Sequence, residues 1–161
     1  MSGAALLPVA GFLLATAAGT AFARAGDIFA GLDGPWSGGG AVTFSNGSTI
    51  PLRCRGRNAV RGGGDHLDQS IDCATPRETF AFRIALDQTN GAILGAWQEI
   101  TWQVQGGVTG AGIPGRLELT VRGQGFSAHA SVLTRGARQS LTIAPAGGGF
   151  PSATIVLRRG R

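Results

Sequence analysis

Few side chains in this sequence can act as nucleophiles, general bases or metal ligands. The 161 residues include two His, two Cys and nine acidic residues, and all 14 basic residues are Arg, with no Lys and no Tyr. Schiff-base chemistry requires Lys, and acid–base chemistry near neutral pH is left to His66 and His129. Neither His has a partner at the spacing of a catalytic triad or a metal site, and no Gly-x-Ser-x-Gly motif occurs. We therefore predict a protein that is not an enzyme and that holds no metal and no cofactor.

An apolar N-terminal stretch predicts export. Residues 4–23 are almost entirely apolar or small, and Ala21-Phe22-Ala23 and Ala23-Arg24-Ala25 both match the small-x-small pattern of signal peptidase sites. We predict a signal peptide over residues 1–25, cleaved after Ala23 or Ala25, and a single β-domain over residues 26–161. An uncleaved membrane anchor is the alternative. The expected location is periplasmic or secreted, with no membrane span after cleavage.

The two cysteines, Cys54 and Cys73, are predicted to form a disulfide because an even pair in an exported chain most simply forms a bridge. The flanking residues alternate between apolar and polar, and Gly62-Gly63-Gly64-Asp65 lies between them as a turn. This pattern indicates a β-hairpin in which Cys54 faces Cys73 and Arg55 faces Asp72. A slip of one residue would reverse the faces of both strands, so the register is tightly specified.

Four arginines of this hairpin form a stripe on its polar face: Arg53, Arg55, Arg57 and Arg61. The stripe is a candidate surface for an anion or an acidic partner. The alternative is a solvated face in which these arginines pair with Asp68 and Asp72, a contribution of only about 0.2–1 kcal/mol for each pair. The formal net charge of +5 does not lead us to expect nucleic-acid binding, because export conflicts with it.

The rest of the chain continues to alternate between apolar and polar residues. Short alternating runs recur every 8–13 residues with turn residues between them, and no stretch keeps a helical period. We predict an all-β fold, an antiparallel meander of about ten short strands that forms a barrel or a strongly curved sheet. A β-sandwich is the alternative fold.

One hairpin places a carboxylate near the predicted interior. Asn90-Gly91 is typical of a tight type I′ turn, which sets Ile84 opposite Trp97 on a return strand from Ile93 to Val104. Strict alternation would turn Glu99 inward. We expect a bulge after Trp97 that returns Glu99 to water, and a buried functional carboxylate is the alternative.

Two resemblances concern known families. Gly34-Pro35-Trp36 resembles the Gly-x-Trp start of lipocalin-like barrels, in which the Trp closes the bottom of the barrel. A longer ordered set resembles a family of small exported proteins from alphaproteobacteria, which has no established activity. That resemblance implies a periplasmic β-protein with one disulfide and transfers no catalytic residues. The set comprises Gly34-Pro35-Trp36-Ser37-Gly38-Gly39-Gly40, Arg53-Cys54-Arg55, Gln69-Ser70-Ile71-Asp72-Cys73, Gly95-Ala96-Trp97-Gln98-Glu99 and Gly125-Phe126-Ser127-Ala128.

Two functions fit these observations. The first is a periplasmic module that binds a hydrophobic or lipid-like molecule inside the barrel, where the small inward residues Ala128 and Ala130 leave room. The alternative is a cell-envelope structural or interaction protein with a filled core. An interior cavity of about 300 Å3 or more would favour the first function. The candidate ligand-binding residues are Trp36, Phe80, Phe82, Trp97 and Glu99.

Overall fold

A computed structural model of the chain describes residues 27–147 and 151–160. The predicted signal peptide lies outside these residues. Within them, the chain forms ten strands and no helix, and so no helix long and apolar enough to cross a membrane. The strands are β1 (Gly34–Thr43), β2 (Thr49–Arg61), β3 (His66–Ala74), β4 (Thr79–Thr89), β5 (Ala92–Glu99), β6 (Val104–Ile113), β7 (Arg116–Gly123), β8 (Phe126–Arg135), β9 (Arg138–Pro145) and β10 (Ser152–Arg159).

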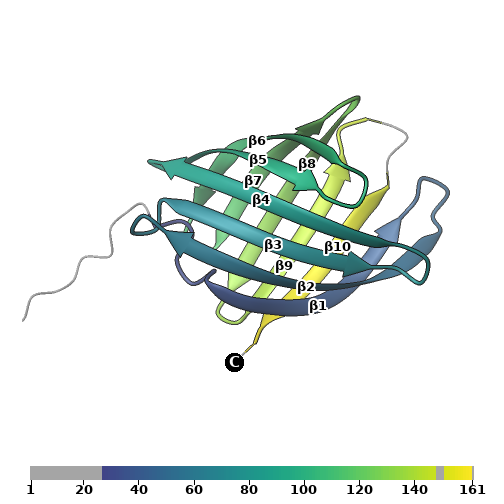
Figure 1. The fold of residues 1–161 in the computed structure, drawn as a ribbon, viewed down its shortest axis with the longest axis horizontal. Coiled ribbons are helices and arrows are strands. Elements are labelled where there is room, and N and C mark those ends of the chain that lie inside the picture. Colours follow the sequence, from purple (N-terminus) through teal and green to yellow (C-terminus); the bar gives the residue numbers. More distant parts are fainter. Residues whose placement is uncertain (1–26, 148–150, 161) are drawn as a thin grey trace, which may run out of the picture.

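The ten strands form one closed antiparallel barrel (Figure 1). Each strand pairs with its neighbour in sequence, and β1 pairs with β10 to close the sheet. The predicted all-β meander of about ten strands is therefore confirmed, and the sheet closes as a barrel rather than splitting into a sandwich. Closure leaves no strand of the sheet with an unpaired edge.

Glycines on β1 allow the first and last strands to approach closely. Gly38 lies opposite Leu157, and Gly40 lies opposite Ile155. A Cβ atom at Gly38 would overlap the carbonyl of Val156, and one at Gly40 would overlap the carbonyl of Thr154. These two positions therefore exclude every side chain larger than a hydrogen atom, as expected where backbone approaches backbone.

The β2–β3 hairpin has the predicted register. Cys54 lies opposite Cys73 with a Cα–Cα distance of 4.1 Å, and the two sulfurs are bonded. Arg55 lies opposite Asp72, and the Gly-rich turn follows β2 as expected. The disulfide points into the barrel, since both cysteines are buried. It indicates a non-reducing, extracytoplasmic environment.

The β4–β5 hairpin is confirmed at its turn and corrected at its end. Asn90 and Gly91 both have positive φ, 52° and 85°, and Ile84 pairs with Trp97. The return strand does not continue to Val104, because β5 ends at Glu99 and residues 100–103 form a turn before β6. No bulge was needed, since the turn itself absorbs the change in alternation.

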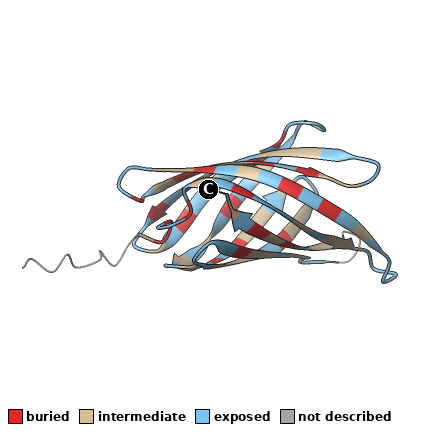
Figure 2. Cartoon of the chain, turned by 90° about the horizontal axis from the view of Figure 1, so that it is seen from below, coloured by how far each residue is buried: buried red, intermediate tan, exposed pale blue. Residues whose placement is uncertain are grey.

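The barrel interior is apolar and is covered at one end by the chain that precedes β1. Buried and exposed residues alternate along the strands (Figure 2). Ile28, Phe29 and Leu32 precede β1 and pack among buried residues of β3 to β8, including Leu67, Leu86 and Val108. The turns after β2, β4, β6 and β8 lie at this same end, because the strands run alternately up and down.

Candidate binding cavity

The interior of the barrel contains a cavity of about 340 Å3. Most of its lining is apolar side chains from the inward positions of β3 to β10, among them Leu119, Val121, Ala128 and Ile143. The polar exceptions are three amide side chains, and no charged side chain of residues 27–147 and 151–160 lines the cavity. The size and the chemistry of the lining match those of pockets for small hydrophobic molecules.

Aromatic rings from different strands meet beside this cavity. The ring centroids of Phe82 and Trp97 lie 6.5 Å apart, and those of Trp97 and Phe126 lie 5.7 Å apart. Trp97 belongs to β5 and Phe126 to β8, and the strands β6 and β7 lie between them. The two rings meet over glycines of these strands, Gly106 and Gly123. At Gly106 a Cβ would lie 2.7 Å from Nε1 of Trp97, which shows how closely the indole approaches that strand. The indole N–H donates to the carbonyl of Arg122 at 3.0 Å, so Trp97 leaves no unpaired polar atom at the wall.

Trp36 and Arg159 close the covered end of the barrel. The guanidinium carbon of Arg159 lies 5.0 Å from the Trp36 ring centroid, within the range of a cation–π contact. The Trp36 indole N–H donates to the carbonyl of Leu32 at 2.7 Å, which fixes the covering segment to β1. Asn58 on β2 donates to the same carbonyl at 3.1 Å. These contacts place Trp36 at the covered end of the barrel, where the Gly-x-Trp resemblance leads us to expect it. Trp36 itself does not line the cavity.

At the opposite end, no described segment inserts into the barrel, and large apolar side chains are exposed. Phe44 follows β1, Ile100 and Trp102 lie in the turn after β5, and Val104 begins β6. Their exposed fractions are 38%, 44%, 62% and 45%. Leu94 and Ile113, near the covered end, are exposed as well, at 68% and 63%, so exposed apolar side chains alone do not distinguish the two ends. Because the segment before β1 covers only the other end, this end is the candidate mouth of the cavity.

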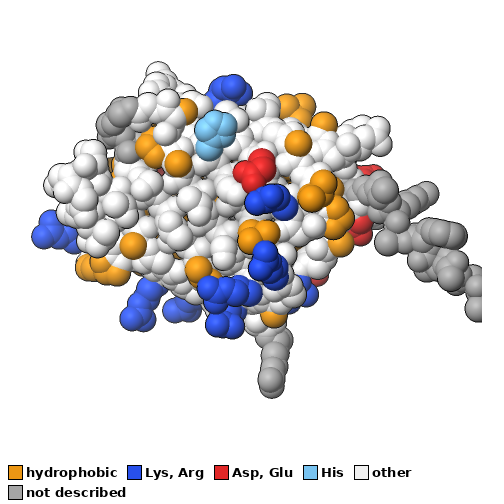
Figure 3. Space-filling view, turned by 180° about the vertical axis from the view of Figure 1, so that it is seen from behind, with side chains coloured by type: hydrophobic (Ala, Val, Ile, Leu, Met, Phe, Trp, Pro, Cys, Tyr) orange, Lys and Arg blue, Asp and Glu red, His pale blue; other side chains and the backbone are white. Residues whose placement is uncertain are grey.

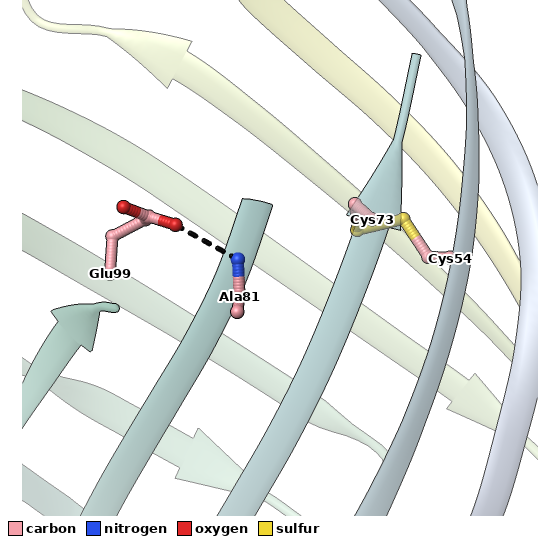
Figure 4. The surroundings of a disulfide bond; sticks show 4 residues. All are labelled: Cys54, Cys73, Ala81 and Glu99. Atoms are coloured by element: carbon pink, nitrogen blue, oxygen red, sulfur yellow. Dashed lines mark hydrogen bonds between the residues drawn. A yellow bond between two sulfur atoms is a disulfide. The ribbon is translucent and has the colours of Figure 1, made fainter. Parts of the chain in front are cut away.

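Glu99 is buried at this mouth and holds the β5–β6 turn. Only 2% of the residue is exposed, so strict alternation, and not the expected return to water, describes its position. Its carboxylate accepts backbone N–H groups of Ala81 at 2.9 Å, Thr101 at 3.0 Å and Trp102 at 2.5 Å. Figure 4 shows the carboxylate turned toward Ala81. Burial alone would raise the pKa of Glu99, but the N–H donors of Ala81 and Trp102, with those of Thr101, outweigh it and lower the pKa.

The structure brings together some of the predicted ligand-binding residues and separates others. Phe82 and Trp97 line the cavity. Phe80 stacks on Phe82 at 6.4 Å but lies outside the lining, as do Trp36 and Glu99. A ligand-binding role for these residues stays a prediction. Sequence reasoning did not select the three amides of the lining, Asn58, Gln69 and Gln139.

The arginine stripe is less neutralised than expected. Arg61 pairs with Asp68, one of the two acidic partners expected for the stripe. Asp72, however, pairs with Arg83 on β4 at 3.0 Å instead of with Arg55. Arg53, Arg55 and Arg57 are exposed and form no ion pair with any described residue.

The two histidines lie outside the barrel wall and away from the cavity. His66 contacts Asp87 through Nδ1 at 2.7 Å and Asp68 through Nε2 at 3.1 Å. These bonds, the one to Asp87 first, raise the pKa of His66 because they favour the charged ring. His129 is exposed on β8. In the part of the chain that the structure describes, no group of three or more His, Cys, Asp or Glu side chains could hold a metal ion.

A larger hollow of about 670 Å3 lies on the wall formed by β2 to β6. Outward side chains such as Arg57, Asp68, Arg83 and Gln98 contribute to its lining, and it is wide open to solvent. The interior cavity is the better candidate for a small-molecule site, because enclosure by apolar walls is what removes a hydrophobic molecule from water.

Two solved structures share this architecture. The crystal structure of Rv2717c from M. tuberculosis superposes with a TM-score of 0.65 at 16% sequence identity, over 83% of this chain and 95% of that chain. The S-type phycobiliprotein lyase CPES from Guillardia theta superposes with a TM-score of 0.57 at 8% identity, over 80% and 88%. This is a lipocalin-like β-barrel fold. At such low identity the likeness shows the fold alone.

No protein-family model and no curated protein sequence matches the chain. The lipocalin-like fold agrees with the resemblance carried by Gly34-Pro35-Trp36, and Trp36 lies at the covered end of the barrel. The alphaproteobacterial origin implied by the longer motif set finds no support among these comparisons and stays a prediction.

The buried carboxylate generates a prediction on stability. Glu99→Gln replaces one acceptor oxygen by an NH2 group that faces backbone donors, so we expect the free energy of unfolding at about pH 7 to fall by about 1–3 kcal/mol. Denaturant unfolding measures this change. The exposed Glu78, which forms no ion pair with described residues, supplies the control variant Glu78→Gln, expected within about 0.5 kcal/mol of the wild-type protein.

The pH dependence follows from the same bonds. Because folding lowers the pKa of Glu99, its contribution is present above the ordinary value of 4.5 and is lost as pH falls below it. The stability difference between wild type and Glu99→Gln should therefore shrink between about pH 7 and about pH 3. A variant as stable as the wild-type protein at neutral pH would contradict this role.

Proposed function

We propose that this protein is a non-enzymatic periplasmic carrier that binds a hydrophobic or lipid-like molecule inside its barrel. The supporting observation is the apolar cavity of about 340 Å3, which exceeds the size expected to favour ligand binding over a filled core. The disulfide, which persists in oxidising compartments, and the apolar N-terminal stretch support the periplasmic location.

The two ends of the barrel support a route for the ligand. One end is covered by Ile28, Phe29 and Leu32 and is held by the Trp36–Arg159 contact. The other end carries the exposed side chains of Ile100 and Trp102, which lower the cost of moving an apolar molecule from water or from a lipid surface toward the cavity.

The chemistry of the cavity favours a carrier over an enzyme. Its wall offers hydrocarbon, aromatic rings and neutral amides, and none of these is a general base or a nucleophile at neutral pH. One protein with this fold is named a phycobiliprotein lyase, so the barrel by itself does not separate the two classes. The proposal therefore rests on the residues of the cavity.

Filling the cavity tests this function. Ala128 points into the cavity from β8, and Ala128→Phe places a ring in the space of the ligand. We expect the affinity for the neutral fluorophore phenylnaphthylamine, measured by its fluorescence increase on binding, to fall by at least about tenfold.

The matched control is His129→Phe on the same strand, where the side chain is exposed outside the barrel. This variant should bind the fluorophore like the wild-type protein, and thermal unfolding should show that both variants are folded. No uptake by the wild-type protein would contradict the proposed function, and equal uptake by Ala128→Phe would place the fluorophore outside the cavity.

A second candidate function uses the outer surface. Ser37 of β1 lies between Arg55 of β2 and Arg158 of β10, and Arg158 in turn lies opposite Arg138 of β9. With Arg53 and Arg57 these residues form an arginine face: Arg53, Arg55, Arg57, Arg138 and Arg158. All five are exposed and none pairs with a described acidic residue. Figure 3 shows arginine side chains gathered along the lower side of the molecule. We propose that this face binds an acidic surface of a cell-envelope protein.

Charge reversal tests the arginine face. Crosslinking in the periplasm should give a discrete product that disappears with Arg55→Glu plus Arg57→Glu, because like charges now oppose the acidic partner. The control, Arg77→Glu plus Arg122→Glu, makes the same change in net charge outside the face and should keep the product. A product that survives in both double variants would contradict this second function.

A further inference from the structure

Apart from the indole N–H of Trp97, which already donates to the carbonyl of Arg122, three amide side chains are the only polar side-chain groups among the described residues that line the cavity. Asn58, Gln69 and Gln139 can donate and accept hydrogen bonds, and none of them carries a charge at any physiological pH. A ligand therefore meets hydrocarbon everywhere except at these neutral groups.

The bonds between protein groups leave two amide oxygens without a donor. Gln69 donates through Nε2 to Oδ1 of Asn58 at 2.9 Å, and Asn58 donates to the carbonyl of Leu32. Gln139 donates through Nε2 to Oγ1 of Thr134 at 3.2 Å. No described residue donates to Oε1 of Gln69 or to Oε1 of Gln139, and Gln139 is only 4% exposed. These two oxygens are not among the fully buried unpaired atoms of the described residues, so a donor from outside the chain can reach them, as polar groups at a cavity wall require.

Both acceptors lie toward the covered end of the barrel. Gln69 is linked through Asn58 to Leu32 of the covering segment. Gln139 is the second residue of β9 and follows the turn at residues 136–137, which lies at that same end. The strands β3 and β9 are separated around the barrel by β2, β1 and β10, so the two amides approach the cavity from different walls.

No cation of the described residues lines the cavity, which argues against an acidic head group inside it. A carboxylate moved into an apolar cavity without a positive partner loses its hydration and gains no ion pair in return. The amide oxygens would also repel it, since both are acceptors. A hydroxyl or amide N–H, in contrast, supplies the donor that each oxygen lacks.

We propose that the cavity binds an uncharged amphiphile whose hydroxyl or amide N–H donates to Oε1 of Gln69 or Gln139, with its apolar chain directed toward the mouth near Phe82 and Phe126. This inference rests on the proposed carrier function and specifies the chemical class of its ligand. It also fixes the orientation of the ligand, head group toward the covered end and chain toward the exposed apolar side chains.

Three probes of equal chain length test the ligand class on the full mature protein. Decanol carries a donor, decyl methyl ether lacks it, and decanoate is charged. Each is titrated against bound phenylnaphthylamine, and displacement gives its affinity. We expect decanol to bind about three- to tenfold more tightly than the ether, which corresponds to one net hydrogen bond, and more tightly than decanoate by a larger factor.

Two variants locate the donor contact. In Gln139→Leu or in Gln69→Leu the advantage of decanol over the ether should shrink toward unity, whereas the exposed Gln98→Leu on β5 should keep it. The contrast between the probes on the wild-type protein needs no variant, so it stands even where a substitution prevents folding.

The outcomes separate this inference from the carrier function. If alcohol and ether displace the fluorophore equally, or if decanoate binds best, the neutral-donor inference is wrong while the carrier function stands. If the alcohol advantage persists in both Gln variants, the polar contact lies elsewhere and the assignment to these amides is overturned. If no probe displaces the fluorophore and the wild-type protein does not take the fluorophore up, the carrier function fails and this inference fails with it.

Discussion

The pairing of β1 with β10 is the contact on which the rest of the structure depends. An antiparallel meander of ten strands has two exposed edges until its first and last strands meet. They meet here because Gly38 and Gly40 present no side chain to the carbonyls of Val156 and Thr154. The seam turns the apolar faces of all ten strands toward one interior, and it brings Trp36 and Arg159 together at the covered end.

The closed barrel encloses a cavity because its inward side chains do not fill the interior. Small residues occupy several inward positions, including Ala128 and Ala130 on β8, while large rings such as Trp97 lie across from them. The covering segment fills one end, and Glu99 fixes the turn at the other by accepting three backbone N–H bonds. The result is an apolar cavity whose polar side chains, among the described residues, are neutral amides, and this lining supports the proposed binding function.

Much of the fold followed from period-two alternation, because the side-chain direction of a strand reverses at each residue. The Cys54–Cys73 register and the Asn90-Gly91 turn depend on local pattern and were predictable. The alternation even placed Gln69 on the face of Leu67 and Ile71, but a glutamine among apolar residues gave no reason to treat it as a site residue. The environments of Asp72 and Glu99 were harder to predict. Asp72 pairs with Arg83 on β4 and not with Arg55, and the turn after Glu99 supplies two of the donors to its carboxylate. The size of the cavity depends on the whole circumference of the barrel, which no local pattern encodes.

The proposed function requires an apolar cavity inside the barrel that a small apolar molecule can enter. Xenon binds to empty apolar cavities and avoids filled cores, so a crystal of the protein under xenon pressure tests this requirement directly. We predict xenon density inside the barrel, in contact with Phe82, Trp97 and Val121 in the cavity of about 340 Å3. An interior filled by side chains, with no xenon bound among these residues, would contradict this account.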